Sequence, residues 1–486
     1  MTTDAGGEAP SALLGGEGVG GRVVLGGAQR AAGFVVANLM TLGGAVILTR
    51  HLGVDDFGYF GTVMALLAVV QGIADAGLTM TGTRELSLVD EAERRRELLA
   101  HVLGLRIALT AVGVVLAVLF AFVAGYDETL VLGTLIAGFG VFLVSVQSAM
   151  LLPLGVEMRN GTIALNEVAR QFVLVGGWAV LVIAGASLLP FFAVQLVVGV
   201  VMLALTPALL ARRHFVAPRW DARQLRALAA IGLPVAISSF LGVIYFRVLV
   251  VMMSVLSDSA SEVGYYVMSA RVIETVTGLP VLLITVVVPV LTVAARDNAD
   301  RVDYMTARMT EAMMLVGVLI AVVITLAADP IVLVMGGEEF KPAVDVLRIQ
   351  CLALVTIFMI ASWSPALLGM GRVRELAVAT GVGVAAMFVL GVALIPPLDA
   401  TGAAIAAVAA DAILCVATYI AVRRAGPGRA LDGIKLAKIA LAGAAACALI
   451  LVPSVPDVLL AGAGALLFAG LAVVLGLVPP ELRWRR

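Results

Sequence analysis

Three ionisable side chains lie inside two long apolar stretches of the sequence. Arg247 belongs to the stretch 229–255, and Arg271 and Glu274 belong to the stretch 263–291. The planar, permanently charged guanidinium of arginine forms paired hydrogen bonds with phosphate oxygens. A cluster of these two arginines and one glutamate has a net positive charge and would suit a diphosphate group. The alternative is an Arg–Glu pair that only ties two helices together.

The spacing of these residues predicts that they meet. The two stretches read as neighbouring membrane-spanning helices joined by a turn near residue 260. Counted from that turn, all three side chains lie roughly 16–21 Å along their helices, because an α-helix rises about 1.5 Å per residue. Arg271 and Glu274 are three residues apart and share a helical face. We therefore predict a charged cluster that lines a substrate cavity.

Two further polar residues are candidates inside other apolar stretches. Asn38 is the strongly polar residue of the first stretch, and we assign it to the same substrate cavity. Asp411 lies about mid-membrane and is a candidate ion-coupling site for a proton or cation, since buried carboxylates often have that role in membranes. Its small neighbours in 403–412 leave a helix-contact role equally open. Asp75 and Arg106 are predicted to lie near the cytoplasmic surface.

The composition shows what kind of protein must position these residues. Hydrophobic residues make up 62% of the 486 and charged residues 13%, against about 45–50% and about 25% in soluble chains. The mean hydropathy of +1.09 predicts a membrane protein with many spans. The net charge of −1 and the absence of a basic domain argue against a nucleic-acid partner. The three scattered histidines predict no metal site, and no motif predicts a cofactor.

A helix that crosses the membrane needs about 20 apolar residues. By this rule the chain has fourteen, with both termini on the cytoplasmic side, because Lys and Arg concentrate in the loops that would then be inside. Among the 32 basic residues, the outside loops hold only Arg50, Lys341 and Arg348. The predicted helices are 28–49, 58–80, 100–124, 129–152, 167–185, 188–211, 229–255, 263–291, 311–328, 346–369, 375–396, 400–422, 437–455 and 458–477.

Two pairs of short segments indicate an internal repeat. FGYFGTVMA at 57–65 is similar to VGYYVMSA at 263–270, and SAMLLPLG at 148–155 is similar to SPALLGMG at 364–371. Both matches are displaced by six helices, which predicts a parallel repeat. The predicted fold is therefore an all-α integral membrane protein with 14 transmembrane helices. Two six-helix lobes would surround a central cavity, and two C-terminal helices would follow them.

This reading divides the chain into six parts. In chain order they are a disordered cytoplasmic leader (1–27), an N-lobe (28–211), a cytoplasmic linker (212–228), a C-lobe (229–424), helices 13 and 14 (437–477) and a cytoplasmic tail (478–486).

Three segments resemble one known group of membrane proteins. Residues 48–61 (LTRHLGVDDFGYFG) resemble the signature that follows the first helix of oligosaccharide-lipid flippases. Residues 263–289 resemble that family's eighth helix, and residues 329–348 (DPIVLVMGGEEFKPAVDVLR) resemble the segment before its tenth. The chain is thus similar, over about 28–425, to the Wzx-like polysaccharide biosynthesis flippases. These belong to the multidrug/oligosaccharidyl-lipid/polysaccharide exporter superfamily.

The resemblance implies a multi-pass protein of the bacterial cytoplasmic (inner) membrane. It would flip a polyprenyl-diphosphate-linked oligosaccharide by alternating access, without being an enzyme. Its partners would be this substrate, membrane lipid and other polysaccharide assembly proteins. Arg271 matches the family's cavity arginine in helix 8. The sequence departs from the family's Arg-x-Asp in helix 7, because Val248 and Leu249 follow Arg247, and it lacks the helix-1 arginines of the peptidoglycan-precursor flippases.

Three alternatives remain open. A drug/cation antiporter of the same superfamily would be expected to have twelve helices and an acidic residue in helix 1. A membrane enzyme, such as a polysaccharide polymerase, would need a sizeable outside loop or a cluster of His, Asp and Glu. A scaffold for polysaccharide assembly would use the charged cytoplasmic segments 84–99 and 292–310.

Overall fold

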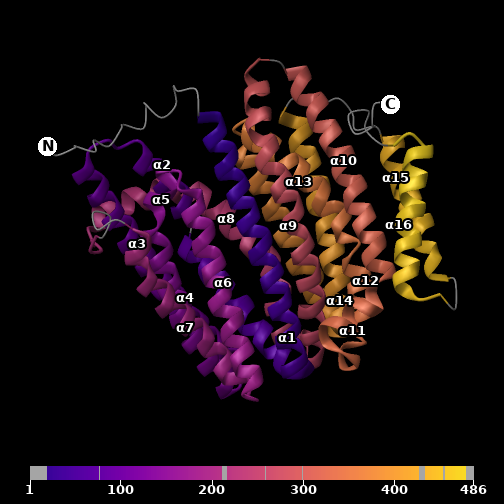
Figure 1. Ribbon diagram of the computed structural model, residues 1–486, viewed down its shortest axis with the longest axis horizontal. Helices are drawn as coiled ribbons and strands as arrows, with labels where there is room; N and C mark the ends of the chain where they lie inside the picture. The colour runs from indigo at the N-terminus through magenta and orange to yellow at the C-terminus, as the bar shows by residue number, and fades with distance from the viewer. Residues whose placement is uncertain are drawn as a thin grey trace. The chain divides into compact units, whose positions relative to one another are not determined.

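The computed structural model is all-helical over the residues it describes, and it has no strand among them. The described ranges are 19–75, 77–210, 216–257, 259–297, 299–425, 433–451 and 455–477. The chain forms two compact units (Figure 1). Unit 1 combines the described parts of Met1–Gly44 and Leu66–Phe240, and unit 2 combines those of Ala45–Ala65 and Leu241–Arg486.

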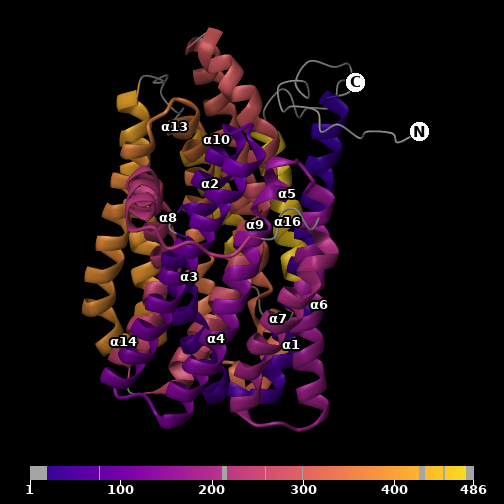
Figure 2. The same cartoon turned by 90° about the vertical axis from the view of Figure 1, so that its left-hand side faces the viewer.

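Unit 1 contains the N-terminal helices. Its α3, α4 and α7 run side by side, as Figure 2 also shows, and α6 packs on α7. Its elements are the first part of α1 (Val19–Asp75) and that helix's last residues, α2 (Leu78–Ser87), α3 (Ala92–Val123), α4 (Glu128–Met150), α5 (Leu152–Val156), α6 (Asn160–Ile183), α7 (Leu188–Leu209) and the start of α8 (Ala222–Leu256).

Unit 2 contains the central part of α1, the rest of α8 and all later helices. Within it, α13 packs against α9, α10 and α14. Its remaining elements are α9 (Ala260–Asp297), α10 (Ala299–Leu326), α11 (Ala328–Gly336), the 3₁₀ turn η3 (Glu338–Phe340), α12 (Ala343–Gln350), α13 (Ala353–Gly369), α14 (Val373–Ala425), α15 (Gly433–Cys447), the 3₁₀ turn η4 (Ala448–Leu451) and α16 (Asp457–Val474).

Two of these helices are far longer than one membrane crossing, and each is interrupted once. α1 has 57 residues and breaks at Gly53, where φ is 74°. α14 has 53 residues and breaks at Asp399, where φ is 48°. Positive φ is natural for glycine and tolerable for aspartate. At the second break, Ser257 donates a hydrogen bond of 2.7 Å to the Asp399 carboxylate, which ties the break to the end of α8.

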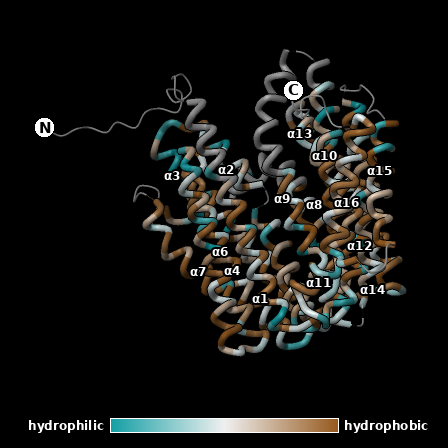
Figure 3. Tube along the Cα trace, turned by 45° about the vertical axis from the view of Figure 1, so that its right-hand side comes forward, coloured by the Kyte–Doolittle hydropathy of each residue, from teal (hydrophilic) through white to brown (hydrophobic). Residues whose placement is uncertain are grey.

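The prediction of an all-α membrane protein is confirmed. Eleven helical stretches of the described chain are long and apolar enough to cross a membrane, and two of them, 56 and 53 residues long, contain the breaks. Counting each of those two as a pair and adding α9, a 38-residue helix, accommodates the fourteen predicted crossings. Figure 3 shows long hydrophobic stretches along these helices. Side chains such as Ile183, 87% exposed, would face lipid.

Some predicted boundaries need correction. α1 begins at Val19, so the predicted disordered leader is helical over 19–27, while residues 1–18 lie outside the described ranges. α8 begins at Ala222, inside the predicted linker 212–228. Both helices extend beyond their apolar cores, because polar residues at the membrane surface can continue a helix that hydropathy alone would end. The predicted tail 478–486 lies outside the described residues.

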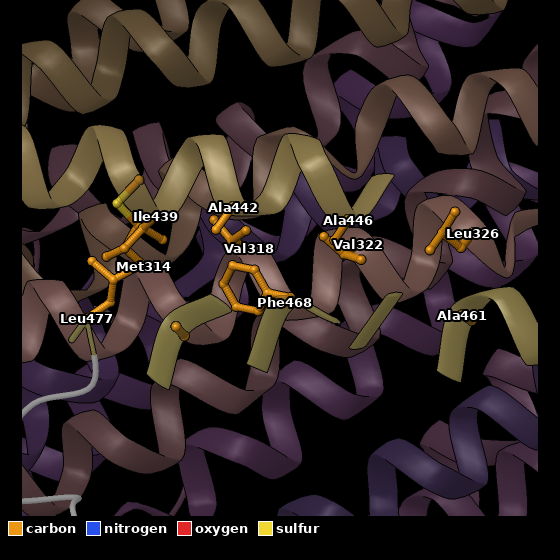
Figure 4. Close-up of a cluster of buried hydrophobic side chains, with 11 residues drawn as sticks. Met314, Val318, Val322, Leu326, Ile439, Ala442, Ala446, Ala461, Phe468 and Leu477 are labelled. Carbon is orange, nitrogen blue, oxygen red and sulfur yellow. The ribbon is translucent and has the colours of Figure 1, made fainter. Parts of the chain in front are cut away.

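The last two helices pack on α10 through small residues (Figure 4). A Cβ on Gly443 of α15 would lie 2.4 Å from Val318, and one on Gly464 of α16 would lie 2.4 Å from Leu326. An ion pair from Lys435 of α15 to Glu311 of α10 adds a polar contact. The buried side chains of this cluster are Met314, Val318, Val322, Leu326, Ile439, Ala442, Ala446, Ala461, Phe468, Ala472 and Leu477.

Candidate functional site

The three charged residues singled out by their spacing contact one another in unit 2. Arg247 of α8 donates from Nη1 to Glu274 Oε1 at 2.6 Å and from Nη2 to Oε2 at 3.4 Å. Arg271 of α9 reaches the same carboxylate over 3.5 Å. The side chains are 29%, 25% and 24% exposed for Arg247, Arg271 and Glu274. We call this set the charged cluster. Each member keeps a surface on which a ligand could bind.

Close packing of α8 against α14 holds one side of the cluster in place. A Cβ on Gly391 of α14 would approach the ends of the Leu249 and Met252 side chains at 3.1 Å and 2.7 Å, so this glycine lets the two helices pack closely. A Cβ on Gly383, also on α14, would lie 3.1 Å from the Tyr245 ring. Because Arg247 lies between these contacts along α8, its side chain starts from a fixed backbone.

Asp411 belongs to the same region of unit 2. It is 4% exposed, and the Tyr245 hydroxyl donates a hydrogen bond to its carboxylate. A cavity of about 70 Å³ lies beside both residues and is also lined by Glu274 and Tyr266. The cavity is large enough to hold water. The structure therefore brings Asp411 and Glu274 to one cavity.

Asn38 belongs to the other unit. It lies on α1 in unit 1, where it is partly exposed, and its role stays a prediction. One helical turn further on, Thr41 accepts a hydrogen bond from Gln171 of α6. A Cβ on Gly33 of α1 would approach Ala164 of α6 at 2.7 Å, so α1 and α6 pack closely on either side of Asn38.

Arg106 lies in a buried network rather than at the surface. It is 7% exposed and pairs with Asp75 at 3.1 Å. It also donates hydrogen bonds to Thr79 at 3.0 Å and to Ser145 at 3.3 Å. The prediction that its side chain reaches the cytoplasmic surface is wrong, because the guanidinium is buried against Asp75, Thr79 and Ser145. The sequence did offer a signal for this ion pair, because Arg106 and Asp75 carry opposite charges and were both predicted near the cytoplasmic surface.

A second group of polar residues in unit 1 was also not foreseen. Gln147 of α4 donates a 2.8 Å hydrogen bond to Asn166 of α6. Arg170 of α6 pairs with Glu167, one helical turn earlier. Arg170 lies within both the predicted helix 167–185 and α6, but its pairing with Glu167 was not predicted. The sequence signal for this group was the recurrence of polar residues, such as Asn166, Glu167 and Arg170, on one face of α6.

Among the described residues, no group of three or more His, Cys, Asp and Glu side chains is placed to hold a metal ion. Three cysteines, Cys351, Cys415 and Cys447, are unpaired thiols.

A comparison with protein families identifies the family of this chain. Residues 47–345 match the family described as polysaccharide biosynthesis protein, which is more than half of the chain. The chain belongs to this family. The family resemblance seen in the three sequence segments is therefore confirmed. Among curated proteins, none matches the chain.

Solved structures show how this member of the polysaccharide biosynthesis family is folded. It resembles the lipid II flippase MurJ in an inward closed conformation, with a TM-score of 0.76 and 13% identity over 92% of this chain and 98% of that one. It also resembles an inward-facing multidrug resistance MATE family transporter of the MOP superfamily. There the TM-score is 0.63 and the identity 14%, over 80% of this chain and 94% of that one.

An outward-facing transporter of the same MATE family gives a TM-score of 0.59 and 15% identity, over 87% of this chain and 98% of that one. At this level of identity the likeness concerns the fold. The chain is thus a multi-pass membrane protein of the polysaccharide biosynthesis family with a MurJ- and MATE-like fold.

Proposed function

We propose that the chain is a flippase that moves a polyprenyl-diphosphate-linked oligosaccharide across the bacterial cytoplasmic membrane for polysaccharide export. The observation that carries this proposal is the charged cluster of Arg247, Glu274 and Arg271 within membrane-spanning helices of a polysaccharide biosynthesis family member. A charge at mid-membrane costs at least about 2.5–3.5 kcal/mol on insertion scales. Three such groups at one place are therefore expected to serve a function.

The geometry of the cluster favours Arg271 as the main ligand of the diphosphate. Arg247 forms a short, two-pronged contact with Glu274, whereas Arg271 reaches the same carboxylate only at 3.5 Å. The longer contact leaves more of the Arg271 donors for a substrate. Because two arginines share one carboxylate, the cluster has an excess positive charge, which complements the negative diphosphate.

Translocation would occur by alternating access, with the sugar-diphosphate headgroup in a polar cavity and the polyprenyl tail in lipid. The membrane potential could drive the step, because an outward-moving negative charge gains about 2.3 kcal/mol per 100 mV when the inside is negative. No covalent bond needs to change, so the protein acts as a transporter rather than an enzyme. We propose that both termini lie in the cytoplasm. We also propose other polysaccharide assembly proteins as its partners.

Asp411 is the candidate ion-coupling residue. Its carboxylate is buried, bonded to Tyr245 and adjacent to the cavity that Glu274 also lines. A proton or cation arriving at Asp411 would change the charge next to the cluster and so alter the affinity for an anionic headgroup.

A drug/cation antiporter is the second candidate, favoured by the likeness to the MATE transporters. It would bind cationic or amphipathic compounds, for which the excess positive charge of the cluster is unsuited. Resistance to cationic drugs on overexpression, without any effect on lipid-linked sugars, would favour it.

Deletion of the protein in the producing bacterium tests the proposal. We expect the undecaprenyl-linked sugar units to accumulate on the cytoplasmic leaflet and the surface polymer to disappear. A wild-type copy should restore export, and an Arg271→Ala copy at equal protein level should not. Units that reach the outer leaflet but stay unpolymerised would contradict the proposal and favour an enzyme or a scaffold.

A further inference from the structure

Unit 1 has a polar surface of its own, on membrane-spanning parts of α1, α4 and α6. We define this amide surface by polar residues that α6 contributes or that contact it: Thr41, Gln147, Asn166, Glu167, Arg170 and Gln171. Three contacts organise it. Gln147 donates to Asn166 at 2.8 Å, Arg170 Nε donates to Glu167 at 3.3 Å, and Gln171 donates to Thr41 of α1.

The amide surface lies on the side of α6 that is turned away from lipid. The large, strongly exposed apolar residues of α6 include Leu165, Phe172 and Ile183, which share one face at about 100° of rotation per residue. On the same wheel, Glu167 and Arg170 fall on the opposite face. The lipid-facing and polar faces of this helix are therefore separate.

The polar face nevertheless remains partly open. The side chains of Glu167 and Arg170 are 40% and 29% exposed, although a network used only for packing would be buried. Charged groups at membrane depth avoid lipid and face the bundle interior or water. An open charged pair on the side opposite to lipid thus marks a surface that a polar ligand can reach.

One buried group on this surface lacks a partner. Gln171 is 8% exposed, and its Oε1 atom accepts no hydrogen bond, while its Nε2 donates to Thr41. An unpaired buried polar atom costs about 1–3 kcal/mol. A hydroxyl group that donates to this oxygen would remove this cost.

The chemistry of the amide surface differs from that of the charged cluster in unit 2. Its one glutamate and one arginine cancel in charge, so it does not attract an anion as the charged cluster does. Amides, carboxylate and guanidinium together offer both donors and acceptors. Sugar hydroxyls also donate and accept, and a neutral surface with both functions complements them.

We propose that the amide surface of unit 1 binds the carbohydrate part of the substrate, with Glu167, Arg170 and Asn166 as hydroxyl-binding residues. This inference rests on the proposed flippase function, since it concerns the sugar part of the substrate that such a flippase would carry. Discrimination between cargoes would come from unit 1, because a site built to hydrogen-bond hydroxyl groups rejects ligands that lack them.

The test measures binding to the purified full chain in lipid nanodiscs. The probes are undecaprenyl diphosphate, the same lipid with one N-acetylglucosamine, and the same lipid with one galactose. We expect at least one sugar-bearing probe to bind wild type more tightly than the sugar-free lipid. The double variant Glu167→Leu/Arg170→Met removes both charges together, so no lone charge is left in the membrane. It should weaken that sugar-bearing probe by roughly tenfold and leave the sugar-free lipid unchanged.

Two further variants make the result specific. Phe172→Leu, on the lipid face of the same helix, should leave all affinities unchanged. Arg271→Ala should weaken all three probes alike. If the double variant is poorly folded, the milder Glu167→Gln should still lower the preference for the sugar-bearing probe by about threefold, because it weakens one acceptor.

The outcomes separate the two proposals. Equal affinity of wild type for all three probes, or an equal loss of all three in the Glu167 variants, would overturn the sugar site and leave the flippase intact. Failure of wild type to bind any of the three diphosphate lipids would contradict the flippase itself, and the sugar site with it.

Discussion

At the scale of single residues, Arg247 and Arg271 share one carboxylate unequally. The short contact from Arg247 to Glu274 resembles a structural ion pair, while the 3.5 Å contact of Arg271 is easily exchanged for a phosphate oxygen. Arg247 thus fits the structural interpretation of the cluster, and Arg271 fits the ligand-binding interpretation. The charge of Glu274 then keeps two cations together in the absence of substrate.

Replacement of Arg271 tests this division of roles. Arg271→Ala should reduce transport of the lipid-linked sugar by at least about tenfold at normal protein levels, because a charge-assisted contact contributes about 1.5–3 kcal/mol. Arg271→Lys should retain part of the activity, since it keeps the charge but loses the planar fork. The control is Arg159→Ala, at the start of α6. Full transport by the Arg271→Ala variant would exclude a substrate-binding role for this residue.

The buried Arg106 makes a prediction about stability rather than transport. Arg106→Leu should lower the free energy of unfolding by about 2–3 kcal/mol, because Asp75 and Ser145 lose a charged partner inside unit 1. The double variant Arg106→Leu/Asp75→Asn should recover part of the loss, since it removes the unpaired carboxylate. Thermal unfolding in detergent measures both. An unchanged melting temperature in the single variant would show that the network contributes nothing.

Residue-level prediction from the sequence succeeded where depth could be counted from a nearby turn. The contact of Arg247 with Glu274 follows from equal distances to the turn between α8 and α9. It failed for Arg106, because the burial of this side chain depends on packing against Asp75, Thr79 and Ser145 from other helices, which the apolar pattern of α3 does not show.

At the scale of elements, the internal repeat has a physical counterpart in the packing of unit 2. The similar segments 57–65 and 263–270 each begin with a Phe-Gly or Val-Gly pair, and these two glycines contact each other. A Cβ on Gly58 would lie 2.4 Å from the Ala260 carbonyl oxygen and 2.9 Å from the Gly264 nitrogen. Backbone contact at this distance favours glycine at both positions.

Substitution of one of these glycines should therefore destabilise the protein. A Cβ on Gly264 would lie 2.3 Å from the Val54 carbonyl oxygen, so Gly264→Ala forces α1 and α9 apart and should cost about 1–3 kcal/mol. Gly242→Ala on α8 is the matched control. Nothing lies within 4 Å of its added Cβ, and alanine favours the helix by up to about 1 kcal/mol. Equal melting temperatures of the two variants would contradict this close contact.

The helices themselves could largely be predicted, since each crossing needs an apolar run of fixed length. Their interruptions could be located only roughly. Gly53 lies within the predicted gap between the first two helices, but hydropathy does not reveal that the chain remains helical on both sides of it. The two predicted lobes differ from the two units because residues 45–65 of α1 join unit 2, and this depends on packing between distant segments.

At the scale of the whole molecule, the account describes two chemically different surfaces on one chain. The charged cluster of unit 2 suits an anion, and the amide surface of unit 1 suits a neutral polyol. Each suits a different part of a ligand in which a diphosphate joins a sugar to a lipid. A protein with this pair of surfaces would select its substrate by both parts of the headgroup.

Outward movement of such a headgroup should respond to voltage. A diphosphate diester carries two negative charges, so 100 mV, negative inside, would favour its outward transfer by about 4.6 kcal/mol at about 2.3 kcal/mol per charge. In vesicles that contain the protein in its native orientation, an inside-negative potassium diffusion potential should accelerate export. Dissipation of the potential should slow it. A rate that is independent of voltage would point to an ion gradient instead, with Asp411 as the residue to test.

The most direct test of the central claim is translocation by the purified protein alone. The full chain is reconstituted in liposomes with undecaprenyl-diphosphate-linked N-acetylglucosamine or galactose on both leaflets, and an impermeant lectin or glycosidase reports the outer leaflet over time. A flippase should make nearly the whole lipid pool accessible, whereas Arg271→Ala proteoliposomes and empty liposomes should expose only the outer half. If wild-type protein also leaves half of each lipid protected, under an imposed potential and without one, the claim that this chain flips lipid-linked sugars is contradicted.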